Sequence, residues 1–111
     1  MSKLSNFLIS IDGKFIRYDL NSLSTTSVLD FALSNVFNVN ASTPRTLTFS
    51  NTPAVDRSLT AVIYVIGDSA VTWPATISWS GGVAPLLDTN WTLIILTFVG
   101  GDCVGSSGAS A

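Results

Sequence analysis

Hydrophobic and polar residues alternate with a period of two along much of this chain, as they do in half-buried β-strands. The clearest case in the first half is Phe7–Ile11 followed by Lys14–Leu20, two alternating segments separated by Asp12-Gly13. An Asp-Gly pair between such segments is preferred in two-residue type I′ turns. The pattern therefore predicts an N-terminal β-hairpin or arm over residues 1–20.

The central segments also predict short strands. Asn21–Thr26 is rich in serine and threonine and is expected to be a polar connector. Val28–Asn40 could begin as a helical stripe, but its second half alternates strictly, so we expect one or two strands with a bend near Ser34-Asn35. Thr46–Ser50 alternates as well, and Leu47 and Phe49 are expected to face inward.

Two longer segments, Leu59–Ile66 and Trp91–Val99, are apolar on both parities, which is typical of strands covered on both faces. Gly100-Gly101 is expected to turn the chain toward Asp102–Val104, and residues 105–111 have the composition of a flexible C-terminal tail. Turn signals recur about every eight to twelve residues between these segments. We therefore expect a single all-β domain over residues 1–111, a small antiparallel β-sandwich or barrel.

The segment Val71–Pro85 combines two bulky tryptophans, two conformationally restricted prolines and a flexible Gly-Gly pair within fifteen residues. Trp73, Ile77 and Trp79 share one parity, which would place them on one face of an extended strand. The prolines at both ends cannot donate ladder hydrogen bonds, so this strand should lie at an edge or be broken at its ends. We interpret the segment as a scaffold or subunit interface, together with the third tryptophan. The candidate residues are Trp73, Pro74, Trp79, Gly81, Gly82, Pro85 and Trp91.

The composition is unusually apolar. Only 11% of residues are charged, against roughly 25% in an average soluble domain, and the mean hydropathy is +0.49. The longest apolar runs, Ala61–Ile66 and Leu93–Leu96, are far shorter than the ~20 residues of a spanning helix, and the first residues do not resemble a signal peptide. A small domain of this kind is expected to cover part of its surface against copies of itself or a partner rather than in a membrane, and we expect an oligomer.

The side chains that most catalysis requires are missing. The sequence has no histidine and one cysteine, Cys103, so it offers neither an activated thiolate, a zinc site nor an intrachain disulfide. Most of the aspartates fall at expected turns, where they form turns or remain solvated. With five scattered basic residues and a net charge of -2, nucleic acid is an unfavourable partner. We expect a non-enzymatic protein without cofactor or metal.

The tryptophans also allow a binding function. Aromatic side chains on β-sandwiches can stack against sugar rings, and Trp73 and Trp79, with Trp91 and with Asp68 or Asp88 as hydrogen-bond acceptors, would form such a glycan platform. The same side chains could instead pack in the core or across a subunit interface, where aromatic residues are enriched. The sequence leaves both alternatives open.

From Asn35 to Gly105 the chain resembles a small module of bacteriophage virion proteins. Four segments carry the resemblance: N-V-F-N-V at Asn35–Val39, T-L-T-F-S-N at Thr46–Asn51, V-T-W-P-A-T-I-S-W-S-G-G-V-A-P at Val71–Pro85 and T-F-V-G-G at Thr97–Gly101. The third segment is the most specific of them. Similar modules commonly carry a tryptophan after the final Gly-Gly pair, where this chain has Asp102-Cys103-Val104.

The resemblance implies a non-enzymatic, trimeric virion component that is assembled in the cytoplasm of a host bacterium. Because the chain has no repeats and no long shaft, it is similar to a capsid decoration (cement) protein, which would bind the major capsid protein or other virion proteins. Two alternatives remain: a tail-fibre or tail-appendage module that binds host-surface glycan, and a carbohydrate-binding β-sandwich of cellular origin.

Overall fold

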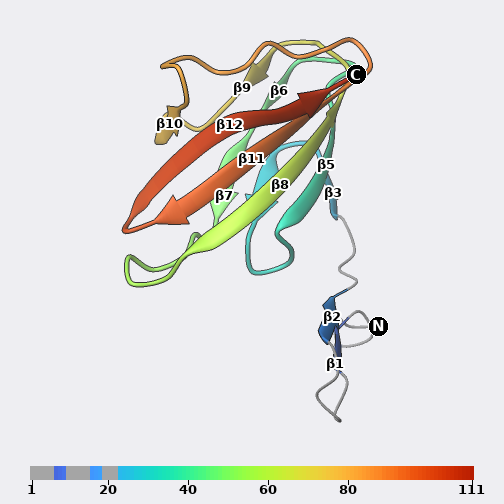
Figure 1. Ribbon diagram of the computed structural model, residues 1–111. Helices are drawn as coiled ribbons and strands as arrows, with labels where there is room; N and C mark the ends of the chain where they lie inside the picture. Colours follow the sequence, from blue (N-terminus) through green and yellow to red (C-terminus); the bar gives the residue numbers. More distant parts are fainter. Residues whose placement is uncertain (1–6, 10–15, 19–22) are drawn as a thin grey trace.

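The computed structural model describes residues 7–9, 16–18 and 23–111 of the chain (Figure 1). These residues form strands and connecting turns and contain no helix, so the all-β prediction is confirmed. The strands are β1 Phe7–Ile9, β2 Ile16–Tyr18, β3 Leu23–Thr25, β4 Val28–Asp30, β5 Val36–Asn40, β6 Arg45–Thr46, β7 Thr48–Ser50, β8 Leu59–Ile66, β9 Val71–Thr72, β10 Ile77–Trp79, β11 Trp91–Val99 and β12 Asp102–Ser110.

Strands β1 and β2 pair antiparallel, with Phe7 opposite Tyr18 and Ile9 opposite Ile16. This is the pairing that the hairpin prediction requires. The predicted Asp12-Gly13 turn lies outside the described residues.

Six strands form the main sheet, in the order β10-β12-β11-β8-β5-β3. Its long central strands, β8, β11 and β12, are antiparallel neighbours. The outer pairs are parallel: β3 with β5, β5 with β8, and β10 with β12. The predicted antiparallel sheet is therefore wrong, and the sheet is mixed. Strands β3, β5 and β8 are parallel because the connections between them leave the main sheet and return to it.

Those connections form a second set of strands behind the main sheet, where β6, β7 and β9 lie in Figure 1. Only Leu47 separates β6 from β7, so residues 45–50 run as one nearly continuous segment. This segment pairs in parallel with β9 on one side and with β4 on the other. The chain thus alternates between the two sets, from β3 to β4, β5, β6–β7, β8 and β9, and winds forward by one strand in each set at every turn.

The core lies between the two sets of strands. The main sheet contributes Phe37 and Ile63, which are fully buried, and the second set contributes Leu29 and Leu47. At one end of the core, Phe31, Phe37, Phe49 and Phe98 form an aromatic cluster in which ring centroids lie 5.0–5.6 Å apart. Aromatic rings at these distances in edge-on arrangements add to the stabilisation from buried area. The cluster joins the turn after β4 and strand β7 to strands β5 and β11 of the main sheet.

Strands β8 and β11 have the bounds that the sequence predicts, but they are not covered on both faces. Along β11 the even-numbered residues Thr92–Phe98 are buried and the odd-numbered ones remain partly exposed. Strand β8 alternates in the same way, with Ala61, Ile63 and Val65 buried. Their apolar outer residues therefore face away from the core of this chain.

Three further sequence-based expectations can be compared with the structure. The segment Asn21–Thr26, expected to be a connector, contains strand β3. Its pairing with β5 holds these polar residues in a strand. The expected segment Thr46–Ser50 is divided at Leu47 into β6 and β7. Leu47 is buried and Phe49 packs against the core, so both face inward as predicted. The bend predicted near Ser34-Asn35 falls between β4 and β5, as expected.

The largest correction concerns the C-terminal tail. Residues 105–111 have the composition of a flexible tail, yet all but Ala111 belong to β12, which runs to Ser110 and pairs with β11 along its length. Gly108 is the extra residue at a β-bulge, since Ile94 faces Ser107 and Leu93 faces Ala109. A Cβ atom on Gly108 would lie 2.9 Å from the Ile95 side chain, so the small residue permits close packing at the bulge.

Gly67, in the turn after β8, yields a stability prediction. Its φ is +91°, and an added Cβ would lie 2.8 Å from the carbonyl oxygen of Ala41. We expect Gly67→Ala to lower the free energy of unfolding by about 2 kcal/mol or more, because both backbone strain and a backbone clash oppose the methyl group. In urea unfolding Gly100→Ala serves as the control, since it has φ +60° but open space around the added atom. Equal losses in both variants would contradict the close approach to Ala41.

Candidate functional site

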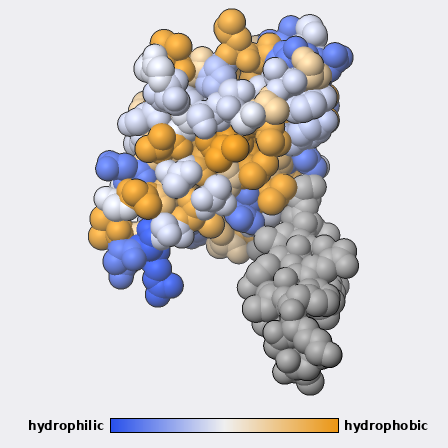
Figure 2. All heavy atoms as spheres, viewed as in Figure 1, coloured by the Kyte–Doolittle hydropathy of each residue, from blue (hydrophilic) through white to orange (hydrophobic). Residues whose placement is uncertain are grey.

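The outer face of the main sheet carries an uncovered apolar surface. We call this surface the apolar face; its residues are Val62 on β8, Leu93, Ile95 and Val99 on β11, and Val104 on β12. Val99 and Val104 are 54% and 48% exposed, and the other three are half-buried. Figure 2 shows apolar residues gathered over the middle of the side that carries β8, β11 and β12. Contiguous exposed apolar surface on a small domain marks a site of association.

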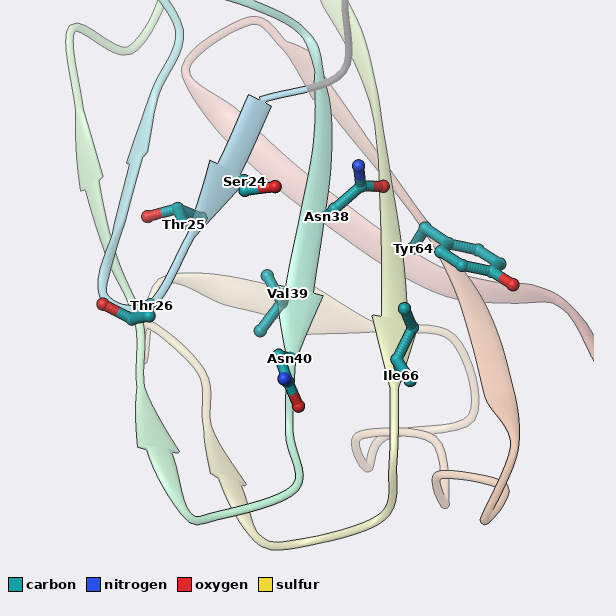
Figure 3. A pocket seen from close by; sticks show the side chains of 8 residues that line it. All are labelled: Ser24, Thr25, Thr26, Asn38, Val39, Asn40, Tyr64 and Ile66. Carbon is teal, nitrogen blue, oxygen red and sulfur yellow. The ribbon is translucent and has the colours of Figure 1, made fainter.

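A groove opens beside the apolar face, over β3, β5 and β8 (Figure 3). Its volume is about 650 Å³, and it is lined by Ser24, Thr25, Thr26, Asn38, Val39, Asn40, Tyr64 and Ile66. Ser24, Asn38 and Tyr64 are direct cross-strand neighbours, and Asn40 is the neighbour of Ile66 in the next row. The sheet register therefore brings hydroxyl, amide and aromatic groups into one row.

Trp91 adjoins this groove from the other side of Tyr64. The two rings stack with centroids 5.7 Å apart and an interplanar angle of 30°. Trp91 begins β11 opposite Ile66, on the outer side of the sheet. It is thus separated from the other two tryptophans.

Trp73 and Trp79 do not form the flat platform that a single strand would give. The predicted strand is broken between β9 and β10, where the Pro74 carbonyl oxygen accepts the Ile77 N–H at 3.2 Å in a turn. The two indole rings meet edge to face at 5.4 Å, and both are partly buried against the core. Packing of Trp79 also requires a glycine, because a Cβ on Gly105 would lie 2.6 Å from its ring.

A small hollow of about 260 Å³ does bring some of the predicted glycan residues together. Asp68, Trp73 and Pro85 line it, with Leu86 and Leu87. Trp79 and Asp88 are not part of its lining. The hollow therefore contains one of the two tryptophans of the predicted platform and is walled mainly by apolar side chains.

Three of the remaining predicted residues, Gly81, Gly82 and Asp88, form turns. Gly81 and Gly82 have φ values of +84° and +88° and turn the chain after β10, where the Gly82 N–H donates to the Trp79 carbonyl oxygen at 2.9 Å. Asp88 accepts the Asn90 N–H at 2.9 Å, and its own N–H donates to the buried Thr92 hydroxyl at 2.8 Å. These bonds confirm Asp88 as a turn former that leads the chain into β11.

Asp30 has a similar position at the other end of the molecule. Its Oδ1 accepts the Ala32 N–H at 3.0 Å and the Asn51 side-chain amide at 2.8 Å. The second bond holds the turn after β4 against Asn51, whose φ of 54° is in the left-handed region. The turn-forming interpretation of the aspartates is confirmed for these two residues.

Cys103 is buried next to the aromatic cluster, and burial raises the pKa of its thiol from 9.0 to about 11. At neutral pH the group is therefore a thiol rather than a nucleophilic thiolate. Between pH 9 and 11 the unfolded state would lose this proton while the folded state keeps it. Folding stability should then fall as pH rises through this range, since the unfolded state binds fewer protons.

Urea unfolding at pH 8, 9 and 10 tests this assignment, with Cys103→Ala as the matched variant. The wild-type protein should lose more stability between pH 8 and 10 than the variant does. Parallel pH profiles would contradict a buried neutral thiol.

Within residues 7–9, 16–18 and 23–111 no three metal-ligating side chains gather at one point. The same part of the chain contains no helix that could cross a membrane.

Comparisons with protein-family models, curated proteins and solved structures give no match to this chain. The functional argument therefore rests on the surfaces and side chains described above and on the resemblance of its sequence motifs.

The groove, and the stacking of Trp91 on Tyr64 beside it, are not evident from the sequence. In the sequence, Asn38 and Asn40 are recognisable only as the polar positions of an alternating strand. The signal that could have identified them is the pair of amides on one parity of β5, but their parallel partners on β3 and β8 depend on long-range pairing.

Proposed function

We propose that this chain is a non-enzymatic structural protein of a bacteriophage particle, a trimeric capsid decoration protein with a sandwich-like subunit. The observation that carries the proposal is the uncovered apolar face on the central strands of the main sheet. The phage assignment is supported by the resemblance of Val71–Pro85 and its flanking segments to virion modules. Trimeric assembly is likewise taken from that resemblance, while the apolar face provides a surface on which copies could associate.

The apolar face suits association by buried area rather than by charge. Its five residues carry no charged group, and β11 places Leu93, Ile95 and Val99 on one continuous side. Burying such side chains contributes about 25 cal/mol for each Å² of apolar surface removed from water. A subunit that joins copies of itself in this way leaves its remaining surface for the capsid.

A decoration protein would act by multivalent attachment. Each subunit of a trimer can make a modest contact with the capsid, and linkage makes the second and third contacts intramolecular, which raises the overall affinity. Such a protein would strengthen the capsid by joining neighbouring capsid subunits. It requires no catalytic group for this purpose.

The test has two parts. Size-exclusion chromatography with light scattering should give a stable trimer, and the purified protein should then bind to capsids that lack it and raise the temperature at which those capsids rupture. A stable monomer that does not bind capsids would contradict the proposal. Binding to purified tails instead of capsids would favour the tail-appendage alternative.

A further inference from the structure

We infer that the groove over β3, β5 and β8 is a binding site for a neutral carbohydrate. This site lies beside the apolar face and is distinct from the hollow at Trp73. The inference goes beyond the proposed structural function, since a capsid decoration protein needs no ligand of this kind.

The lining of the groove has the chemistry that sugar recognition requires. Ser24 and Asn40 offer a hydroxyl and a carboxamide group, which can donate to and accept from the hydroxyl groups of a sugar. Tyr64 and Ile66 offer aromatic and aliphatic surface for the C–H side of the ring. Figure 3 shows Asn38 beside Tyr64, and Asn40 beside Ile66 in the next row.

Two contacts hold these groups in place. The Asn40 carboxamide oxygen accepts the Ser42 N–H at 2.9 Å, which orients the side chain and leaves its amide nitrogen as a donor. The Tyr64 ring is supported by Trp91, which stacks against it at 5.7 Å. A preformed arrangement reduces the ordering cost of binding.

The charge of the lining selects the class of ligand. Among residues 7–9, 16–18 and 23–111, every residue that lines the groove is neutral. Arg45 lies close by, but its Nε donates to the Asn40 backbone carbonyl oxygen at 2.7 Å and its side chain does not line the groove. A phosphate or carboxylate ligand would find no paired charge here, whereas a neutral oligosaccharide would match the hydrogen-bonding groups. The volume of about 650 Å³ is within the range of small-molecule sites.

The experiment uses the full-length protein and a panel of neutral oligosaccharides: hexamers of α-linked glucose, β-linked glucose, mannose and N-acetylglucosamine. Two-dimensional NMR follows the side-chain amides of Asn38 and Asn40, and a hexamer of galacturonic acid serves as the anionic probe. We expect at least one neutral hexamer to shift these amides and neighbouring signals of β3, β5 and β8, with the anionic probe weaker. No shift at about 20 mM of any neutral hexamer would overturn the inference, as would shifts centred on Trp73.

Matched variants locate the site. Tyr64→Leu keeps an apolar side chain in the sheet, and Ser24→Val places a residue favoured in strands on β3. Each should weaken binding of the active hexamer about fivefold or more. Thr60→Val, also on the outer side of β8 but outside the groove, should leave the affinity unchanged. If one groove variant fails to fold, the other decides the result. Unchanged affinity in a folded groove variant would overturn the assignment.

Discussion

Replacing Ile95 with lysine is expected to convert the proposed trimer into monomers that remain folded. Ile95 lies in the middle of the apolar face, between Val62 and Ser106 on the neighbouring strands. In an assembly that covers this face, the lysine would place an unpaired charge in the interface, at a cost of about 3–5 kcal/mol for each copy. In the monomer, the ammonium group can reach water while its methylene groups cover the sheet.

Light scattering after size-exclusion chromatography gives the molar mass, and circular dichroism reports whether the variant is folded. The control is Leu86→Lys, which also replaces an apolar residue with lysine but lies in a loop and is 94% exposed. It should keep the assembly intact. An Ile95→Lys variant with the wild-type mass, or dissociation of Leu86→Lys alone, would contradict the role assigned to the apolar face. Monomers should also bind capsids far more weakly, since they lose multivalent attachment.

The distribution of apolar residues predicts the strands better than it predicts their environment. Leu59–Ile66 and Trp91–Val99 were predicted with the bounds that the structure has. Both segments are apolar on both parities, but the second set of strands covers only one side of them. A hydrophobic pattern cannot distinguish a residue covered by its own chain from one left on the outer side of a sheet.

The pairing of the strands could not be predicted from local patterns. Strands β3, β5 and β8 are separated by segments that belong to the other set of strands, and their parallel pairing depends on how the whole chain winds. An alternating segment looks the same whether its partner runs parallel or antiparallel. The groove depends on this winding. Local sequence patterns therefore could not show that Asn38 and Tyr64 are cross-strand neighbours.

The tryptophan segment shows a different limit. The prolines correctly indicated an edge strand, since β10 lies at the edge of the main sheet. The break at Pro74 was not predicted; it falls between Trp73 and Trp79 and turns one ring against the edge of the other. A common parity for these residues holds only if the strand is continuous. Trp91, placed in the same group by residue type alone, lies instead on the outer side of the sheet with Tyr64.

Strand β12 gives the last prediction, because its second half has a composition that opposes strand formation. Glycine and serine have low β-propensity, so this half depends on its partner. The partner is β11: Ser106 pairs with Ile95, Ser110 pairs with Thr92, and the Ala111 N–H donates to the Trp91 carbonyl oxygen at 3.1 Å. Deleting residues 106–111 should lower the free energy of unfolding by roughly 3–6 kcal/mol, from several backbone hydrogen bonds at about 1 kcal/mol each and the lost cover of β11.

Urea unfolding at one fixed protein concentration measures this loss, because dissociation of an assembly would otherwise add to it. The control is a full-length variant with Ser106→Thr and Ser110→Thr, which exchanges serines for a residue favoured in strands. This variant should be as stable as the wild-type protein or slightly more so. A deletion that costs less than about 0.5 kcal/mol would show that the segment is a flexible tail. Val104 of the apolar face and Gly105 beneath Trp79 precede the deleted residues, so a large loss would be assigned to the pairing of residues 106–111 with β11.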